Sequence, residues 1–206
     1  VVPIGVIPVY GRSADNLRDH RHVTSLLHRI QTTEYGVEVK PVLSFDERGH
    51  QKNNTTYFVY GSSENGEKPE SFYPTVEDFI GEGGTFLNPE AVRTNKPGKT
   101  AGTKIQGKEA VGGLRFSRKT LKPKEAAGYI LLSGTTKTSD SIALLTSGCK
   151  TKLQVQKMLE EVKEHWIQKV NVAFETGNSD VDNYLKWICF QPILRRIYGC
   201  SFLPYH

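Results

Sequence analysis

The chain of 206 residues has few of the residues that mark disulfide-rich, metal-binding or membrane-spanning proteins. Its three cysteines (Cys149, Cys189 and Cys200) form no CxxC pair and have no histidine at the spacing of a zinc site. A sparse, odd cysteine content is typical of a reducing compartment, so we predict a cytoplasmic location. No stretch approaches the roughly eighteen consecutive apolar residues of a membrane span, and we expect no membrane partner. A secretory hydrophobic region is also missing.

Clustered charge is scarce as well. The chain carries 27 Lys and Arg against 22 Asp and Glu, a net charge of +5, but the cations are scattered and locally offset by acids. A nucleic-acid-binding surface would gather them on one face with aromatic residues interleaved. We therefore predict no nucleic-acid partner.

The chain up to about Ser133 reads as strands and loops. The clearest strand is Thr55 to Tyr60, which is β-branched and aromatic throughout. Val1 to Tyr10 contains Pro3 and Pro8, which restricts it to an edge strand or an extended lead-in. His22 to Gln31 is predicted as another strand.

Later stretches of this half of the chain are less regular. Val37 to Phe45 is predicted to continue the strand before it. Asn88 to Gly113 is poor in apolar residues and predicts a long irregular segment. Leu114 to Arg118 and Gly128 to Ser133 read as strands around a turn at Lys122 to Glu125.

Two helices are predicted after this half. Lys152 to Val170 carries an apolar stripe at helical spacing, and Thr151 with Gln154 forms a capping-box pattern. A second helix is expected from Ser179, kinked at Pro192. We divide the chain into an antiparallel β-sandwich (residues 1–134), a helical linker (135–178) and a further helical segment (179–206).

The histidines near the start are the first candidates for a site. His20 and His22 could share a metal ion with Asp19 or, together with Arg12, contact an anion or a sugar. The alternative is an exposed segment with ordinary salt bridges. Gly81 to Gly84 lacks the spacing of a phosphate-binding loop, and we expect a turn that needs positive φ there.

Several stretches together resemble the inverting glycoside phosphorylases of the cellobiose-phosphorylase type, glycoside hydrolase family 94. Within that family the chain is most similar to 1,2-β-oligoglucan phosphorylases and to the phosphorylase-like domain of cyclic β-1,2-glucan synthases. The stretches are His22 to Arg29 with Tyr35 to Pro41; Phe79 to Ala91; Leu121 to Glu125 with Tyr129 to Gly134; and Trp166 with Asn183 to Gln191 and Arg195. Lys124 stands where the family usually has glycine.

The resemblance implies a mainly β fold with C-terminal helices: an antiparallel supersandwich, a helical linker and the first helix of an (α/α)6 barrel, which we expect to be cut off at His206. It implies that the parent enzyme uses inorganic phosphate to cleave a β-linked gluco-oligosaccharide, giving α-glucose 1-phosphate with inversion and without a cofactor. The family's catalytic residues lie beyond the position of His206. The resemblance therefore assigns no catalytic residue here, and we expect the chain alone to be inactive.

Substrate contacts are predicted at Arg12, His20, His22 and His206, and the Asn88 to Gly113 segment is a further candidate. We also expect an exposed apolar face at Tyr184, Ile188 and Ile197 to drive dimerisation or other self-association. The alternatives are a dimerisation domain or a stand-alone carbohydrate-binding sandwich. The latter would use exposed aromatic residues, for which Tyr57 with Tyr60 or Phe72 with Tyr73 could serve.

Overall fold

The computed structural model describes the backbone of residues 1–10, 23–46, 49–194, 196–197 and 200–201, and the side chains of residues 1–10, 23–43 and 52–194. The chain divides into two compact units, Val1–Val155 and Gln156–His206. Each unit is described by itself. The domain limits at residues 134 and 178 stay a prediction.

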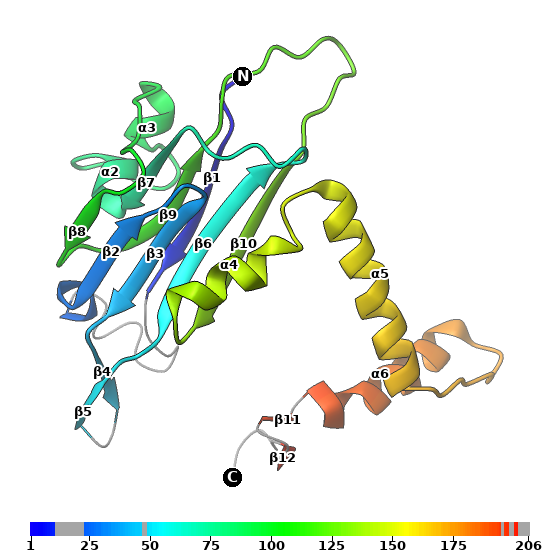
Figure 1. The fold of residues 1–206 in the computed structure, drawn as a ribbon. Coiled ribbons are helices and arrows are strands. Elements are labelled where there is room, and N and C mark those ends of the chain that lie inside the picture. The colour runs from blue at the N-terminus through cyan, green and yellow to red at the C-terminus, as the bar shows by residue number, and fades with distance from the viewer. Residues whose placement is uncertain (11–22, 47–48, 195, 198–199, 202–206) are drawn as a thin grey trace. The chain divides into compact units, whose positions relative to one another are not determined.

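The larger sheet of the first unit, sheet B, has five strands in the order β10-β6-β3-β2-β8, all antiparallel (Figure 1). Its strands are β2 (His28–Thr32), β3 (Gly36–Pro41), β6 (Thr56–Ser63), β8 (Lys104–Gln106) and β10 (Tyr129–Thr136). β4 (Leu43–Asp46) and β5 (Gly49–Lys52) pair with each other as a separate two-stranded sheet.

The smaller sheet, sheet A, has the order β1-β9-β7 and is also antiparallel. Its strands are β1 (Ile4–Val9), β7 (Ser71–Thr75) and β9 (Ala110–Arg115). β1 lies at an edge of this sheet, which confirms the placement that Pro3 and Pro8 indicated.

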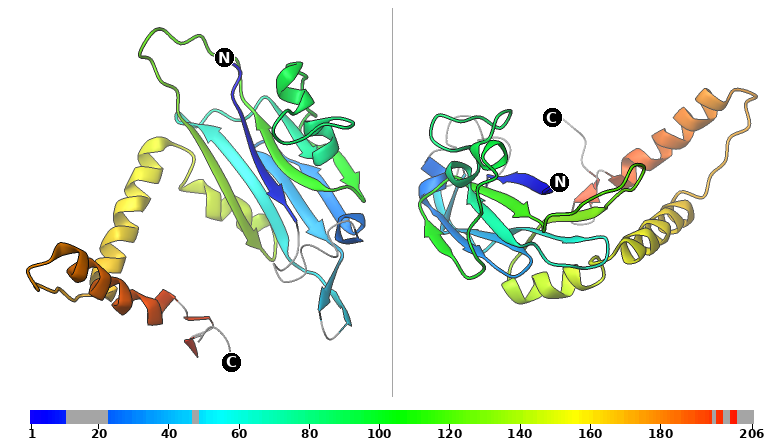
Figure 2. Two further views of the ribbon diagram at one scale, coloured as in Figure 1. Left: turned by 180° about the vertical axis from the view of Figure 1, so that it is seen from behind. Right: turned by 90° about the horizontal axis from the view of Figure 1, so that it is seen from above.

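The two sheets pack against each other in a sandwich-like arrangement, seen from above in Figure 2. Ile30, Val37 and Val59 of sheet B meet Phe72 and Leu114 of sheet A in one buried cluster. Gly112 of β9 lies directly over Val59, and a Cβ atom at Gly112 would overlap that side chain. A glycine is therefore required where the sheets approach most closely.

Short helices lie on the outer faces of both sheets (Figure 1). α4 (Ser139–Ser147) lies over β6 and β10 and buries Ile142 completely. On the other side, α2 (Val76–Ile80) and α3 (Glu90–Arg93) pack Phe79 and Ala91 against Tyr73 and Val111 of sheet A. The first unit therefore consists of helix, sheet, sheet and helix layers.

The second unit consists mainly of helices. α5 (Lys152–Lys169) begins in the first unit and continues into the second, which also holds α6 (Ser179–Leu194), β11 (Arg196–Ile197) and β12 (Cys200–Ser201). The predicted capping box is confirmed, because Gln154 N donates to Thr151 Oγ1 at 3.4 Å and Thr151 N to Gln154 Oε1 at 3.1 Å. Trp166 of α5 packs on Phe190 of α6, with ring centroids 5.6 Å apart. No described helix is long and apolar enough to cross a membrane.

Two predictions about the first unit are wrong. The strand expected from His22 begins at His28, because residues 23–26 are helical. The segment Asn88 to Gly113 is not irregular throughout, since it contains α3, which packs Ala91 on sheet A, β8, which pairs with β2 of sheet B, and the start of β9. The strand expected at Gly128 to Ser133 is confirmed as part of β10, whereas the one expected at Leu114 to Arg118 overlaps β9 only at Leu114 and Arg115.

Candidate functional site

A polar hollow of about 850 Å³ lies between α2 and α3, on the outer side of sheet A. It is lined by acidic, basic and amide side chains and by a glycine-rich turn: Glu77, Asp78, Ile80, Gly81, Glu82, Gly83, Gly84, Asn88, Glu90, Arg93 and Lys96. This hollow coincides with the Phe79 to Ala91 stretch that carried part of the family resemblance.

The first wall is α2 and the turn after it. Thr75 caps the helix, since its Oγ1 accepts from Asp78 N at 3.0 Å and donates to Asp78 Oδ2 at 2.9 Å. The helix ends at Gly81, where φ is 77°, and Gly83 follows with φ of 68°. The expected positive-φ turn is thus confirmed, and Cβ-bearing residues would disfavour it.

The second wall is α3 and the residues that follow it. Ala91 is fully buried under the helix. Tyr73 Oη donates to the carbonyl oxygen of Lys96, and Arg115 Nη1 donates to that same oxygen at 3.2 Å. These buried side chains of sheet A therefore anchor the residues that follow α3 to the sheet.

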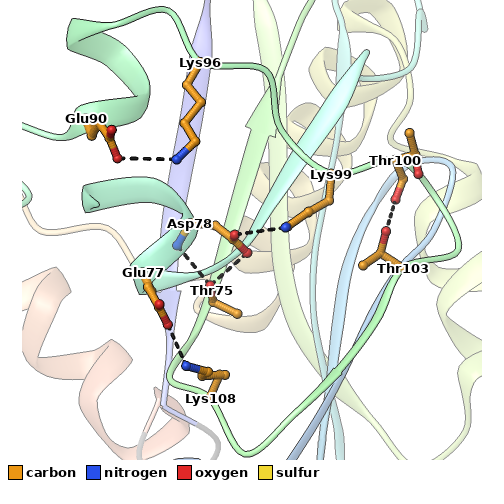
Figure 3. Close-up of polar contacts among 9 residues, drawn as sticks. All are labelled: Thr75, Glu77, Asp78, Glu90, Lys96, Lys99, Thr100, Thr103 and Lys108. Atoms are coloured by element: carbon orange, nitrogen blue, oxygen red, sulfur yellow. Dashed lines mark hydrogen bonds and ion pairs between the residues drawn. The ribbon is translucent and has the colours of Figure 1, made fainter. Parts of the chain in front are cut away.

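Three ion pairs join the walls to neighbouring segments (Figure 3). The Glu77–Lys108 pair has an Oε2–Nζ distance of 2.7 Å, the Asp78–Lys99 pair 3.5 Å and the Glu90–Lys96 pair 3.4 Å. The last of these joins the first residue of α3 to the segment that follows the helix. The hydrogen bond from Lys108 lowers the pKa of Glu77, and the same contact raises the pKa of Lys108. A carboxyl with a lowered pKa is suited to an ion pair and not to general-acid catalysis, which needs a raised one.

Three polar side chains of the hollow have no side-chain hydrogen bond or ion pair within the described part of the chain: Glu82, Asn88 and Arg93. They offer a carboxylate acceptor, an amide that both donates and accepts, and a guanidinium donor. Next to the turn, Phe86 is 43% exposed and packs on Phe79 with ring centroids 6.1 Å apart. Hydrogen-bond acceptors and donors that line one hollow near an exposed aromatic ring suit a neutral ligand with several hydroxyl groups.

The substrate contacts predicted at Arg12, His20, His22 and His206 lie outside the described residues. His28, the neighbouring histidine, is buried, and its two ring nitrogens lie 3.3 Å and 3.2 Å from the carbonyl oxygens of Lys108 and Tyr10. This side chain fastens the ends of three segments together and has a structural role. Among the described residues, no three His, Cys, Asp or Glu side chains are grouped to hold a metal ion.

The aromatic pairs suggested for a sugar-binding strand face are not available as flat platforms. Phe72 and Tyr73 are 2% and 1% exposed, because they face opposite ways from β7 into the two hydrophobic clusters. Tyr60 is half-buried, and its hydroxyl donates to Glu38 Oε1 at 2.7 Å. The prediction for Phe72 and Tyr73 is wrong, because the sheet on which they lie is covered on both faces.

No model of a known protein family matches the chain, and no curated protein matches it. Glu82 is the residue of the hollow that the sequence interpretation missed, whereas Asn88 and Arg93 lie within the Asn88 to Gly113 segment that was a candidate for substrate contacts. The only sequence signal for Glu82 is its position in Gly81–Gly84, which we interpreted as a turn. Because α2 and α3 are five and four residues long, helical periodicity could not indicate that their polar residues converge.

Proposed function

We propose that this chain is the non-catalytic N-terminal portion of a β-glucan phosphorylase, and that the hollow between α2 and α3 binds a β-linked gluco-oligosaccharide. The parent enzyme would cleave its β-glucosidic bond with phosphate and release α-glucose 1-phosphate with inversion. The observation that carries the saccharide role is the convergence of Glu82, Asn88 and Arg93 on one open polar hollow. Sugar hydroxyls both donate and accept hydrogen bonds and can therefore use all three groups.

The architecture supports the same proposal. The resemblance implies a supersandwich, a helical linker and a barrel helix. The first unit, with its two packed antiparallel sheets, would correspond to the sandwich, α5 to the linker, and α6 to the start of the (α/α)6 barrel. We further propose that the parent enzyme is cytoplasmic and homodimeric and uses no cofactor.

The saccharide role is tested by ligand-observed NMR on the whole chain with sophorose, cellobiose and glucose. We expect saturation transfer from the protein to the disaccharides, weakened at least several-fold by Asn88→Ala or Arg93→Ala, because each removes a direct hydrogen-bonding partner. Lys68→Ala is the matched control, since Lys68 is an exposed surface lysine paired with Glu34 and does not line the hollow. Equal transfer in all variants would remove the hollow from the proposal.

The phosphorylase role is tested by phosphate release from α-glucose 1-phosphate with the same sugars as acceptors. The chain alone is expected to be inactive, and the longer protein that contains it active with sophorose. Turnover by the chain alone would contradict its non-catalytic role. Inactivity of the longer protein with every acceptor would instead favour a carbohydrate-binding module without enzymatic activity.

A further inference from the structure

The outer face of sheet B is only half covered. α4 lies over β6 and β10, and its first residue, Ser139, contacts Glu38 and Lys40 of β3, whereas no described helix lies over β2 and β8 (Figure 1). On this bare half lies a shallow hollow of about 160 Å³. Its polar lining consists of Arg29, Gln31, Glu38, Lys40, Lys104 and Gln106.

The strand register brings three cations of this lining together. Along β2 the side chains of His28, Ile30 and Thr32 are buried, so Arg29 and Gln31 point outward. Arg29 lies directly opposite Lys40 of β3, and Gln31 lies opposite Lys104 of β8. Lys104 is therefore the diagonal neighbour of Arg29, within reach of its long side chain. We call Arg29, Lys40 and Lys104 the cationic strip.

The positive charges of the cationic strip outnumber the carboxylates near them. Glu38 lies 3.8 Å from Lys40, but its other oxygen accepts from Tyr60 and it also accepts from Ser139. Arg29 donates only to the carbonyl oxygen of His28, at 3.2 Å, and Lys104 has no side-chain partner among the described residues. Like charges directly opposite each other destabilise a sheet.

Five other lysines of the first unit are paired with acids. Lys68, Lys96, Lys99, Lys108 and Lys119 each lie within 3.5 Å of a carboxylate oxygen. Unlike these five, Arg29 and Lys104 have no ion pair among the described residues, and both line the same hollow.

We propose that the cationic strip binds the phosphate group of a small phosphorylated ligand or of inorganic phosphate itself. The planar guanidinium of Arg29 presents two parallel donors to two oxygens of such a group, and Lys104 supplies a point charge from the neighbouring strand. The amides of Gln31 and Gln106 flank these cations and donate to the remaining oxygens. This site lies on the opposite sheet from the α2–α3 hollow and does not depend on the saccharide proposal.

The test is a titration of the ¹⁵N-labelled chain with inorganic phosphate and with glycerol 1-phosphate, each beside sodium chloride at the same ionic strength. Amide shifts confined to β2, β3 and β8 are expected with both phosphates and not with chloride. Tighter binding of glycerol 1-phosphate would identify an ester as the ligand, and equal binding would identify the phosphate group alone. Identical shifts with phosphate and chloride would overturn the proposal.

Two variants of Arg29 distinguish the contribution of its paired guanidinium donors from the contribution of its positive charge. Arg29→Gln is expected to weaken phosphate binding on the order of tenfold, the factor of one charge-assisted hydrogen bond, and Arg29→Lys by less. Lys68→Gln, a change at a paired lysine, should have no effect. In phosphate-free buffer, Arg29→Gln should also raise Tm by about 1–3 °C, because it removes the repulsion from Lys40. Unchanged affinity in Arg29→Gln would contradict the site.

Discussion

At the scale of single residues, two tyrosines on neighbouring strands differ in whether their hydroxyl group makes a hydrogen bond. Tyr60 donates to Glu38, a carboxylate that is only 6% exposed. Tyr129 packs on Phe116, with ring centroids 4.6 Å apart, and its buried hydroxyl has no hydrogen-bond partner among the described residues. A hydroxyl without a partner loses its hydration on folding and gains nothing in return.

Replacing each tyrosine by phenylalanine should therefore change stability in opposite directions. Tyr129→Phe is expected to raise the free energy of unfolding by about 1 kcal/mol, because it removes an unsatisfied polar atom. Tyr60→Phe should lower it by about 1–3 kcal/mol, because it leaves the buried Glu38 without that donor. Urea unfolding of the two variants measures the difference. A loss of stability in Tyr129→Phe would show that the hydroxyl has a partner in solution.

His28 gives the fold a dependence on pH. Burial lowers the pKa of His28 below its ordinary value of 6.5, although the carbonyl oxygens of Lys108 and Tyr10 act in the opposite direction. The unfolded chain therefore binds a proton at His28 at a higher pH than the folded chain does. The stability from this residue is complete above pH 6.5 and is lost as the pH falls through the folded pKa.

We expect the free energy of unfolding to decline as the pH falls below 6.5, at up to about 1.4 kcal/mol per pH unit from His28. His28→Gln should remove that part of the slope, whereas His165→Gln, a change at an exposed histidine of α5, should retain it. Urea titrations at pH 7.5, 6.5 and 5.5 provide the comparison. Equal slopes in the wild type and His28→Gln would refute this role.

At the scale of elements, the turn before β10 carries a conformational cost. Glu125 N donates to the carbonyl oxygen of Lys122 at 3.0 Å, and Lys124 has φ of 68°. Pro123 followed by a residue with positive φ is the pattern of a type II turn, in which glycine is favoured at the third of the four turn residues, here Lys124. Lys124 is the residue that replaces the glycine usual in the resembling family.

Lys124→Gly should consequently stabilise the chain by about 1 kcal/mol, and raise Tm by about 2–4 °C for a chain of this size. Lys122→Gly is the matched control in the same turn, at a position without positive φ. Its expected effect is none or a small loss, because glycine gains conformational entropy in the unfolded chain. Calorimetry measures the Tm of both variants. A lower Tm for Lys124→Gly than for the wild type would exclude strain at this turn.

Elements with a strong local signal were predictable from the sequence. Thr56 to Tyr60 and the helix after Thr151 carry their own periodicity or capping residues, and both occur as predicted. The α2–α3 hollow was not predictable, because its walls depend on buried contacts to Tyr73 and Arg115. The pairing of β10 with β6 was not predictable either, because it is a non-local choice that the intervening turn does not determine.

At the scale of the whole molecule, several apolar residues of α6 are exposed to solvent. Tyr184, Trp187 and Ile188 are 63%, 55% and 45% exposed. Ile197, the third residue predicted for this face, belongs to β11, where side chains are not described. Apolar surface of this kind favours association between copies.

We expect the average mass measured by light scattering to rise with concentration. Ile188→Glu should reduce this rise, because it places a charge on the apolar face. Asn171→Glu adds the same charge at an exposed position between the helices and serves as the control. A concentration-independent monomer mass for the wild type would contradict the proposed association.

The edge position of β1 has a consequence for what such association can build. Pro8 stands in this edge strand opposite Val111 and has no N–H to offer to an added strand. At the other edge of sheet A, Lys99 exchanges two backbone hydrogen bonds with Phe72 and occupies part of β7. Addition of a further strand at either edge of sheet A is thereby hindered. Copies that meet through α6 should therefore associate through side-chain contacts and not by extending sheet A.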